Sequence, residues 1–229
     1  MQKAKCTAIV LAAGQGKRMG TKVQKQYLEI QGKPILYYSL RAFEESAVID
    51  EIILVVGKEQ KEYCQEQIVN KYGITKVKSI VEGGKERYHS VWNGLLEVTD
   101  EYVFIHDGAR PFINDAILQR AFDAVQVHRA CVVGMPVKDT IKVADENGFV
   151  EETPERSRLW LIQTPQVFET ALVKEAYSRL MKEDIIKVTD DAMVVEQMLG
   201  EKVKLVEGSY ENIKITTPED MVVASALLP

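Results

Sequence analysis

The chain has 229 residues, of which 46% are hydrophobic and 28% are charged, and its formal net charge is −5 at pH 7. This length and composition predict one folded domain with a large core, and they exclude both a disordered chain and a nucleic-acid-binding protein with a global excess of positive charge. Three scattered cysteines, a short polar N-terminus and the lack of an apolar run of ~18 residues predict a soluble cytoplasmic protein without disulfides, a zinc site or a membrane span.

Short β-branched segments alternate with longer segments of helical periodicity along most of the chain. The pattern predicts strands at 6–11, 51–56, 77–81, 102–106 and 130–137, which alternate with helices at 34–45, 59–72, 87–97 and 114–128. It then predicts helices at 170–182 and 190–199, strands at 203–207 and 212–215, and a last helix from Pro218. Strands that are apolar throughout are buried on both faces, which indicates a parallel sheet between layers of helices. The expected fold class is α/β: a three-layer α/β/α sandwich with a mostly parallel, Rossmann-like sheet.

The regular alternation is interrupted between residues 139 and 158. Two short β-prone pieces, at 140–143 and 149–152, flank Asn147-Gly148, which is a strong hairpin-turn signal. An isolated two-stranded hairpin is only marginally stable in water, so we expect a protruding β-arm that packs on a second copy of the chain. The alternative is a surface excursion on a monomer. We expect residues 1–229 to form a single domain, with 139–158 as the β-arm for dimerisation.

A glycine-rich loop with several cations follows the first predicted strand. It reads Ala12-Ala-Gly-Gln-Gly-Lys-Arg-Met-Gly20, and Lys22 and Lys25 come shortly after it. Met19 stands where a dinucleotide fingerprint has its third glycine, and no Walker A spacing is present. Ligands of α/β sheets bind beyond the carboxyl ends of strands, so the loop indicates a clamp for a polyphosphate. A solvated basic surface loop is the alternative.

Two further strand ends are expected at the same edge of the sheet. Gly83-Gly84 allows a flat ring to approach the backbone, and Ser90 could bond a base or sugar edge; a plain strand-to-helix turn is the alternative. Asp107 directly follows a buried strand, where a carboxylate suits a hard cation, and Arg110 beside it suits a phosphate. The alternative for Asp107 is a turn or helix cap. No His/Cys constellation indicates a transition metal, so Mg²⁺, or another divalent cation, is expected.

Motifs along almost the whole chain match one known family in order. They are Ala12-Ala-Gly-x-Gly-x-Arg-Met, Lys25-Gln-Tyr, Gly83-Gly-x-x-Arg87, His106-Asp-Gly-Ala-Arg-Pro111, Asp139-Thr140, Thr164-Pro-Gln166, Thr189-Asp190 and Val206-Glu-Gly with Asn212-Ile-Lys214. The chain thereby resembles the 2-C-methyl-D-erythritol 4-phosphate cytidylyltransferases. The resemblance implies a nucleotidyltransferase-type fold and a Mg²⁺-dependent homodimer with interlocking β-arms. It also implies transfer of the cytidylyl group from CTP to methylerythritol phosphate in non-mevalonate isoprenoid biosynthesis.

The resemblance, together with the strand-end motifs, assigns roles to individual residues. Arg18 and Lys25 are expected to stabilise the transition state on the triphosphate, and Asp107 to help place the metal. The expected nucleotide-binding residues are Ala12, Ala13, Gly14, Gly16, Lys17, Gly83, Gly84 and Ser90. The expected acceptor-binding residues are Asp107, Arg110, Thr140, Arg156, Thr164, Thr189 and Lys214, with Thr140 and Arg156 reaching the partner's site from the arm. Gln24 stands where the family usually has a proline before the catalytic lysine.

The expected chemistry needs no activated nucleophile. A phosphomonoester oxygen is already adequate, so catalysis reduces to positioning and charge neutralisation, and the three histidines, His89, His106 and His128, are expected to be structural. Two other functions stay open from the sequence. A ribitol 5-phosphate cytidylyltransferase shares the fold, although the stretch at 156–160 and Thr189-Asp-Asp191 favour methylerythritol phosphate. A non-catalytic nucleotide-binding module is the second, against which the retained Arg18 and Lys25 argue.

Overall fold

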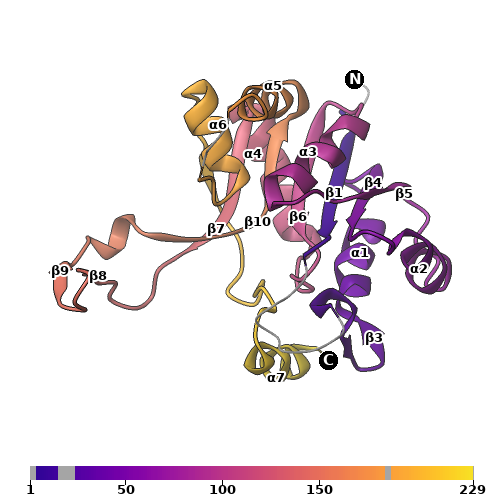
Figure 1. Cartoon of the computed structure of the whole chain (residues 1–229), viewed down its shortest axis with the longest axis horizontal. Helices are drawn as coiled ribbons and strands as arrows, with labels where there is room; N and C mark the ends of the chain where they lie inside the picture. Colours follow the sequence, from indigo (N-terminus) through magenta and orange to yellow (C-terminus); the bar gives the residue numbers. More distant parts are fainter. Residues whose placement is uncertain (1–3, 15–23, 184–186, 229) are drawn as a thin grey trace.

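The computed structural model describes residues 4–14, 24–183 and 187–228. Within these residues the centre of the molecule is a seven-stranded sheet in the order β11-β7-β10-β6-β1-β4-β5 (Figure 1). The strands are β1 (Cys6–Ala12), β4 (Glu51–Val56), β5 (Val77–Glu82), β6 (Tyr102–Asp107), β7 (Ala130–Pro136), β10 (Trp160–Glu169) and β11 (Lys204–Glu207). Neighbouring strands pair in parallel, except that β10 pairs antiparallel with both β6 and β7. The prediction of a mostly parallel sheet is confirmed.

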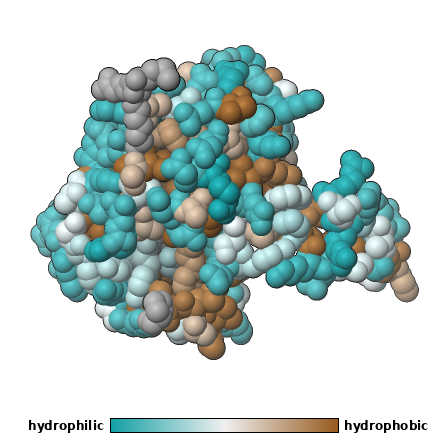
Figure 2. Space-filling view, turned by 180° about the vertical axis from the view of Figure 1, so that it is seen from behind, coloured by the Kyte–Doolittle hydropathy of each residue, from teal (hydrophilic) through white to brown (hydrophobic). Residues whose placement is uncertain are grey.

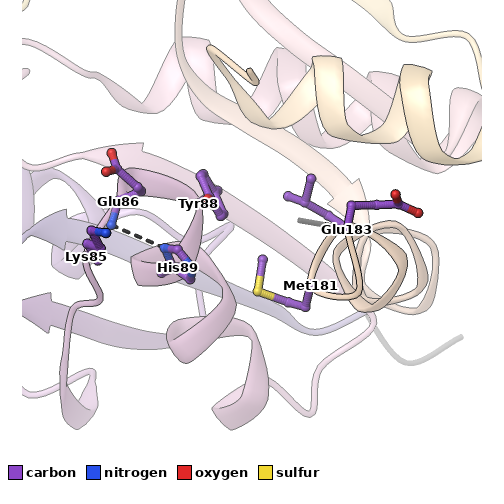
Figure 3. Close-up of a pocket in the computed structure, with 7 residues that line it drawn as sticks. Lys85, Glu86, Tyr88, His89, Met181 and Glu183 are labelled. Carbon is purple, nitrogen blue, oxygen red and sulfur yellow. Dashed lines mark hydrogen bonds between the residues drawn. The ribbon is translucent and has the colours of Figure 1, made fainter. Parts of the chain in front are cut away.

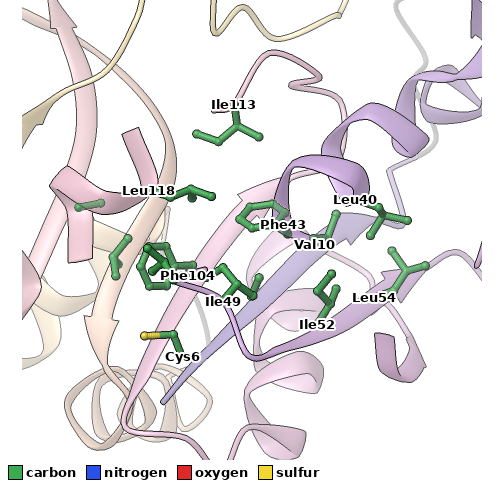
Figure 4. Packing of buried hydrophobic residues seen from close by; sticks show 14 of the residues in the cluster. Cys6, Val10, Leu40, Phe43, Ile49, Ile52, Leu54, Phe104, Ile113 and Leu118 are labelled. Atoms are coloured by element: carbon green, nitrogen blue, oxygen red, sulfur yellow. The ribbon is translucent and has the colours of Figure 1, made fainter. Parts of the chain in front are cut away.

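Helices cover both faces of this sheet. One layer consists of α1 (Ile35–Glu45), α2 (Lys61–Cys64), a π-helical turn η3 (Gln65–Asn70) and α4 (Asp115–His128); the other consists of α3 (Arg87–Glu97), α5 (Thr170–Leu180) and α6 (Asp191–Leu199). On β1, Val10 packs in the first layer's core and Ile9 in the second's, because successive side chains of a strand point to opposite faces. Figure 4 shows Val10 beside Leu40 and Phe43 of α1. The predicted three-layer sandwich is therefore confirmed.

Two of the elements expected from the sequence differ in the structure. The helix expected at 59–72 becomes α2 and η3, and Gly73 follows with a φ of 64°, which favours glycine. The prediction of a strand at 212–215 is wrong, because these residues form no strand in the structure. The Asn212 side chain donates to the carbonyl oxygen of Thr164 (2.9 Å), and the Ile215 N–H donates to that of Ala109 (2.9 Å), so isolated hydrogen bonds hold this segment in place of a strand ladder.

The structure also contains strands that were not expected. β10 leads from the arm into the middle of the sheet. It contains the buried polar residues Gln163, Thr164 and Gln166, so it lacks the continuous apolar pattern by which the other strands were predicted. A short hairpin of β2 (Glu29–Ile30) and β3 (Lys33–Pro34) precedes α1.

The predicted β-arm projects from the body between β7 and β10 (Figure 1). Its strands β8 (Val143–Ala144) and β9 (Val150–Glu152) pair antiparallel and are shorter than expected. The carboxylate of Asp145 accepts hydrogen bonds from the backbone N–H groups of Asn147 and Phe149, both at 2.9 Å, and closes the turn. Phe149 and Val150 are 72% and 60% exposed. The hairpin is thus confirmed, and its apolar side chains have little cover within one chain.

Helix α7 (Pro218–Leu227) packs on a small separate core that includes Ile30, Ile35 and Ile215. Its outer face exposes apolar side chains, with Val222 73% exposed, and gives the brown surface at the bottom of Figure 2. No helix within the described part of the chain is both long and apolar enough to cross a membrane.

Candidate active site

A pocket of about 640 Å³ lies at the edge of the sheet where β1, β5 and β6 end. Its volume is in the range of small-molecule sites, ~300–1,000 Å³. Of the residues predicted from the sequence, Ala13, Gly14, Lys25, Gly84, Ser90, Asp107 and Lys214 line it. The fold therefore brings together segments that are far apart in the sequence, such as those of Lys25 and Ile215, which are 190 residues apart and joined by a hydrogen bond. Gly16, Lys17 and Arg18 lie outside the described residues, so their roles stay predictions.

Two glycines let the turn after β5 pack against Ala13, which follows β1, and against the first turn of α3. A Cβ atom on Gly83 would collide with the Cβ of Ala13 and lie 2.8 Å from the hydroxyl oxygen of Ser90, and one on Gly84 would collide with His89. The Gly84 N–H donates to this Ser90 hydroxyl at 3.1 Å. This close packing brings Ala13, Gly84 and Ser90 to one end of the pocket, and the binding of a flat ring there stays a prediction.

Lys25 begins a short 3₁₀ turn, η2 (Lys25–Tyr27), and its ammonium group donates to the carbonyl oxygen of Ile215 at 3.0 Å. The next residue, Gln26, is buried and donates to the carbonyl oxygens of Ala12 (2.5 Å) and Gly14 (3.1 Å). Gln26 thus ties the turn that carries Lys25 to the end of β1. No role was predicted for Gln26 from the sequence, although its place inside the Lys25-Gln-Tyr motif was a signal.

Gln24, which replaces the family's usual proline, has a φ of −63°. This is the value that a proline ring would impose, so the backbone before Lys25 has the same local shape. The Gln24 side chain also accepts a hydrogen bond from Gln26 at 2.8 Å, which a proline could not do. In this chain, side-chain bonding takes the place of ring rigidity.

Asp107 lies at the end of β6 among three cations. Its carboxylate oxygens are 2.7 Å from Lys214 Nζ, 3.5 Å from Arg87 Nε and 3.9 Å from Arg110 Nε. Burial alone would raise the pKa of Asp107, but the positive charges of Arg87, Lys214 and Arg110 outweigh it and lower that pKa well below the usual range. Asp107 is therefore a permanently ionised group in the floor of the pocket.

A chain of hydrogen bonds behind the pocket fixes Asp107. The Asp107 N–H donates to the Thr164 hydroxyl oxygen at 3.1 Å, and that hydroxyl lies 3.0 Å from His106 Nδ1. His106 Nε2 lies 3.1 Å from the carbonyl oxygen of Arg110, which can only accept, so Nε2 carries the proton and Nδ1 accepts from Thr164. Burial lowers the pKa of His106 to about 4, which keeps the ring neutral. This agrees with the structural role expected for His106.

The other predicted acceptor residues do not line this pocket in the single chain. Thr164 is 4% exposed, and its hydroxyl is used by Asp107 and His106. The Arg110 guanidinium donates to the carbonyl oxygen of Asn212 at 2.7 Å. Thr189 is exposed, and its hydroxyl donates to the sulfur of Met193 on α6. Thr140 and Arg156 are exposed on the arm, where Arg156 donates to the carbonyl oxygen of Lys138 at 2.8 Å.

A divalent cation fits this pocket only as an ion shared with a ligand. The described residues contain no group of three or more His, Cys, Asp or Glu side chains that could hold a metal by themselves. Asp107 can offer one ionised carboxylate. Because Mg²⁺ is usually held by one or two carboxylates together with substrate phosphates and water, a single aspartate is compatible with it.

A second hollow, of about 390 Å³, lies between the start of α3 and the end of α5 (Figure 3). Its lining includes Tyr88, His89 and Met181 but none of the predicted site residues. The dashed line in Figure 3 is the hydrogen bond from the Glu86 N–H to His89 Nδ1, 3.3 Å long. It forms one half of a capping box that fixes the first turn of α3.

Comparisons with known proteins show the family to which the chain belongs. A family model described as 2-C-methyl-D-erythritol 4-phosphate cytidylyltransferase matches residues 6–229. The protein of that name from Lachnospira eligens is 54% identical over 224 residues, which cover 97% of this chain and 98% of the relative. The one from Caldanaerobacter subterraneus subsp. tengcongensis is 51% identical with the same coverage of both chains.

Solved structures with the same names have the same fold. A 4-diphosphocytidyl-2C-methyl-D-erythritol synthase from Anaerococcus prevotii superposes with a TM-score of 0.87 at 35% identity, covering 98% of this chain and 96% of the other. A 2-C-methyl-D-erythritol 4-phosphate cytidylyltransferase from Thermus thermophilus gives a TM-score of 0.76 at 32% identity, with 96% of both chains covered. The chain therefore belongs to the 2-C-methyl-D-erythritol 4-phosphate cytidylyltransferase family.

Proposed function

We propose that this chain transfers the cytidylyl group of CTP to 2-C-methyl-D-erythritol 4-phosphate in the non-mevalonate pathway to isoprenoid precursors. The products are 4-diphosphocytidyl-2-C-methyl-D-erythritol and pyrophosphate. The observation that carries the proposal is the convergence of Lys25, Asp107 and Lys214 on one pocket in a chain of this family. We also propose a cytoplasmic location, because the three cysteines are free thiols and CTP is a cytoplasmic nucleotide.

The small residues at one end of the pocket support the choice of a pyrimidine nucleotide. Gly83 packs directly against Ala13, and Ala13, Gly84 and Ser90 line the pocket at this end. The single ring of cytosine would rest against these small residues more easily than a purine. The basic residues that follow Gly14 in the sequence, Lys17 and Arg18, would then bind the triphosphate.

The chemistry is the attack of an acceptor phosphate oxygen on the α-phosphorus of CTP. One O–P bond forms, the bond to the β-phosphate oxygen breaks, and pyrophosphate leaves. The Lys25 ammonium and the Arg18 guanidinium would neutralise the charge that accumulates on the α-phosphate, and no proton acceptor is needed. The pocket is therefore suited to catalysis by position and charge.

Asp107 would hold a divalent cation such as Mg²⁺, with the nucleotide supplying the other ligands. When bound, this ion would neutralise charge on the phosphate oxygens. The low pKa of Asp107 supports this role, because the carboxylate needs no deprotonation before it binds. Lys214, whose ammonium group lies 2.7 Å from the same carboxylate, would bind the acceptor phosphate.

We propose that the acceptor site is completed by the arm of a second copy. Thr140 and Arg156 lie on the arm and do not line the pocket of their own chain. The arm exposes Phe149 and Val150, and a two-stranded hairpin with so little apolar packing of its own is only marginally stable unless it packs on a partner. A homodimer with arms packed on the neighbouring subunit would cover this surface and deliver Arg156, which can bind a phosphate through two hydrogen bonds.

The test is pyrophosphate release by the purified protein with CTP, UTP, ATP or GTP, each with methylerythritol phosphate or ribitol 5-phosphate as acceptor. We expect turnover with CTP and methylerythritol phosphate to exceed all other combinations. Preference for ribitol 5-phosphate would identify the sister activity instead. Tight CTP binding without pyrophosphate release would identify a nucleotide-sensing module.

A further inference from the structure

Arg87, the first residue of α3, links two acids that belong to different parts of the molecule. Its two terminal nitrogens each donate to one carboxylate oxygen of Asp191 at 2.7 Å, and its Nε lies 3.5 Å from Oδ1 of Asp107. Arg87 also lines the pocket. The guanidinium group therefore spans from the floor of the pocket to the first residue of α6.

The acid at the far end of this link is fully buried. Asp191 is 0% exposed, and its carboxylate also accepts a hydrogen bond from the Tyr177 hydroxyl at 2.5 Å. The N–H groups of Asp191 and Ala192 both donate to the side-chain oxygen of Gln166, at 2.9 and 2.8 Å. Burying an unpaired carboxylate would cost several kcal/mol of folding free energy, and the ion pair with Arg87 avoids this cost. Together, the bonds from Arg87 and the bonds to Gln166 hold the start of α6 in place.

The three segments that meet at Arg87 carry different parts of the reaction. α3 follows Gly84, which lines the pocket where we propose that the nucleotide binds. β6 ends at Asp107, and α6 follows Thr189, which is predicted to bind the acceptor. A planar guanidinium has donors in a fixed fork and can serve both carboxylates together, whereas a lysine ammonium cannot match that geometry.

We propose that Arg87 is a positioning residue, which orients the Asp107 carboxylate and holds the start of α6 at a fixed distance from it. It acts through Asp107 and Asp191, without taking part in the bond changes. The inference rests on the proposed function only for the identity of the nucleotide and the acceptor. A shift of the start of α6 by ~1 Å would be enough to slow the reaction about 100-fold.

The test uses Arg87→Lys, Asp191→Asn and the double variant, with Arg129→Lys as the matched control. Arg129 also bridges two acids, Glu169 at 2.7 Å and Glu201 at 3.2 Å, but it is on the surface and does not line the pocket. Thermal unfolding selects variants that are folded at the assay temperature. Tyr177→Phe, which removes one hydrogen bond to Asp191, gives a milder change if Asp191→Asn does not fold.

We expect kcat to fall about 10- to 100-fold in each single variant, with a change in the KM for CTP of less than about threefold. The double variant should be no slower than the slower single variant, because both changes break the same link. Arg129→Lys should keep the wild-type kcat. The ratio of CTP affinities with and without Mg²⁺, measured by calorimetry, should fall equally in both single variants, because both misalign Asp107.

Two results would overturn the proposal. A large loss in Arg87→Lys with a wild-type kcat in Asp191→Asn would mean that Arg87 binds the nucleotide directly. A lower melting temperature with a wild-type kcat and a wild-type calorimetric ratio in both variants would mean that the link only stabilises the fold. Failure of the wild type to use methylerythritol phosphate would contradict the proposed function instead, and the calorimetric ratio would still decide the role of Arg87.

Discussion

Lys25 is the charge that we propose to act on the α-phosphate. Its ammonium group donates to the carbonyl oxygen of Ile215, and the neighbouring Gln26 ties the turn that carries it to Ala12. We expect Lys25→Ala to lower kcat by about 10²–10³, the effect of losing one preorganised charge, and to weaken CTP binding much less, because the charge contributes most in the transition state. The same loss is expected for Arg18→Ala. Steady-state kinetics with CTP and methylerythritol phosphate would measure both.

Lys174→Ala is the matched control for this prediction. Lys174 is also a half-buried lysine whose ammonium group donates to a backbone carbonyl, that of Val98 at 2.6 Å, but it does not line the pocket. It should keep the wild-type kcat. If Lys25→Ala kept it as well, the assignment of Lys25 to the α-phosphate would be wrong.

The thiol of Cys131 should make the stability of the protein depend on pH in alkaline solution. Burial raises the pKa of Cys131 from 9.0 to about 12, so above pH 9 the unfolded state loses this proton before the folded state does. The stabilisation is present below pH 9 and is lost as the pH rises toward 12. Between pH 8 and pH 10 the free energy of unfolding should fall by about 1 kcal/mol more in the wild type than in Cys131→Ala.

Urea unfolding at the two pH values measures this difference. All other titrating groups are shared by the two proteins, so their contributions cancel in the comparison. An equal decrease in both proteins would show that Cys131 ionises as easily in the folded state as in the unfolded state.

At the scale of elements, the pocket depends on how closely the turn after β5 packs against Ala13. Gly83→Ala would place a methyl group against Ala13 and Ser90, and the two segments would have to move apart. Overpacking of this kind costs ~1–3 kcal/mol of folding stability. Because the segments that move border the pocket, we also expect the KM for CTP to rise about tenfold, which is ~1.4 kcal/mol of binding free energy. Steady-state kinetics and thermal unfolding of the same preparation would measure the two effects.

Gly94→Ala is a control with similar crowding but no contact with the pocket. A Cβ atom there would lie 2.9 Å from Ile9 and 3.2 Å from Val55, inside the core between α3 and the sheet. This variant should have a lower melting temperature and a wild-type KM for CTP. An unchanged KM in Gly83→Ala would show that the nucleotide does not bind at this end of the pocket, beside Ala13 and Ser90.

At the scale of the whole molecule, the arm should join dimerisation to acceptor binding. The ends of its hairpin lie close together, since Lys142 Nζ donates to the Thr153 hydroxyl oxygen at 2.7 Å, so residues 142–152 can be removed with little strain. The shortened protein should be a monomer that binds CTP nearly as well as the wild type but no longer binds methylerythritol phosphate. Analytical ultracentrifugation and calorimetry would measure these changes. A shortened protein that remained a dimer would place the interface elsewhere.

Mixing two inactive variants tests whether the sites are shared between subunits. A dimer of one Lys25→Ala chain and one Arg156→Ala chain has one complete site if Arg156 serves the neighbouring pocket. Activity should then return to about a quarter of the wild-type value, because half of the mixed dimers' sites are complete and random exchange makes half of the dimers mixed. Lys25 and Lys214 line the same pocket, so mixing Lys25→Ala with Lys214→Ala should restore nothing. If subunits exchange and neither mixture regains activity, Arg156 acts within its own chain.

Local patterns in the sequence were sufficient for most elements and for part of the site. The apolar segment at 51–56 became β4 with the same bounds, and the Asn147-Gly148 signal became the turn of the arm, because both depend on short-range preferences. β10 and the segment at 212–215 were not predicted correctly. Their conformations depend on partners far away in the sequence, as the bond from Asn212 to Thr164 shows.

The sequence by itself determined the order of the α/β elements and the motifs at the strand ends, because apolar periodicity and turn chemistry act over a few residues. Only the tertiary structure decided which of these side chains reach the pocket. In the folded chain Lys214 forms an ion pair with Asp107, the Thr164 hydroxyl bonds to the buried His106, and Arg87 forms an ion pair with the buried Asp191. These contacts arise where separate elements meet, and the charge and hydrogen-bond partners of a buried group are set by its neighbours in space, whatever their distance along the chain.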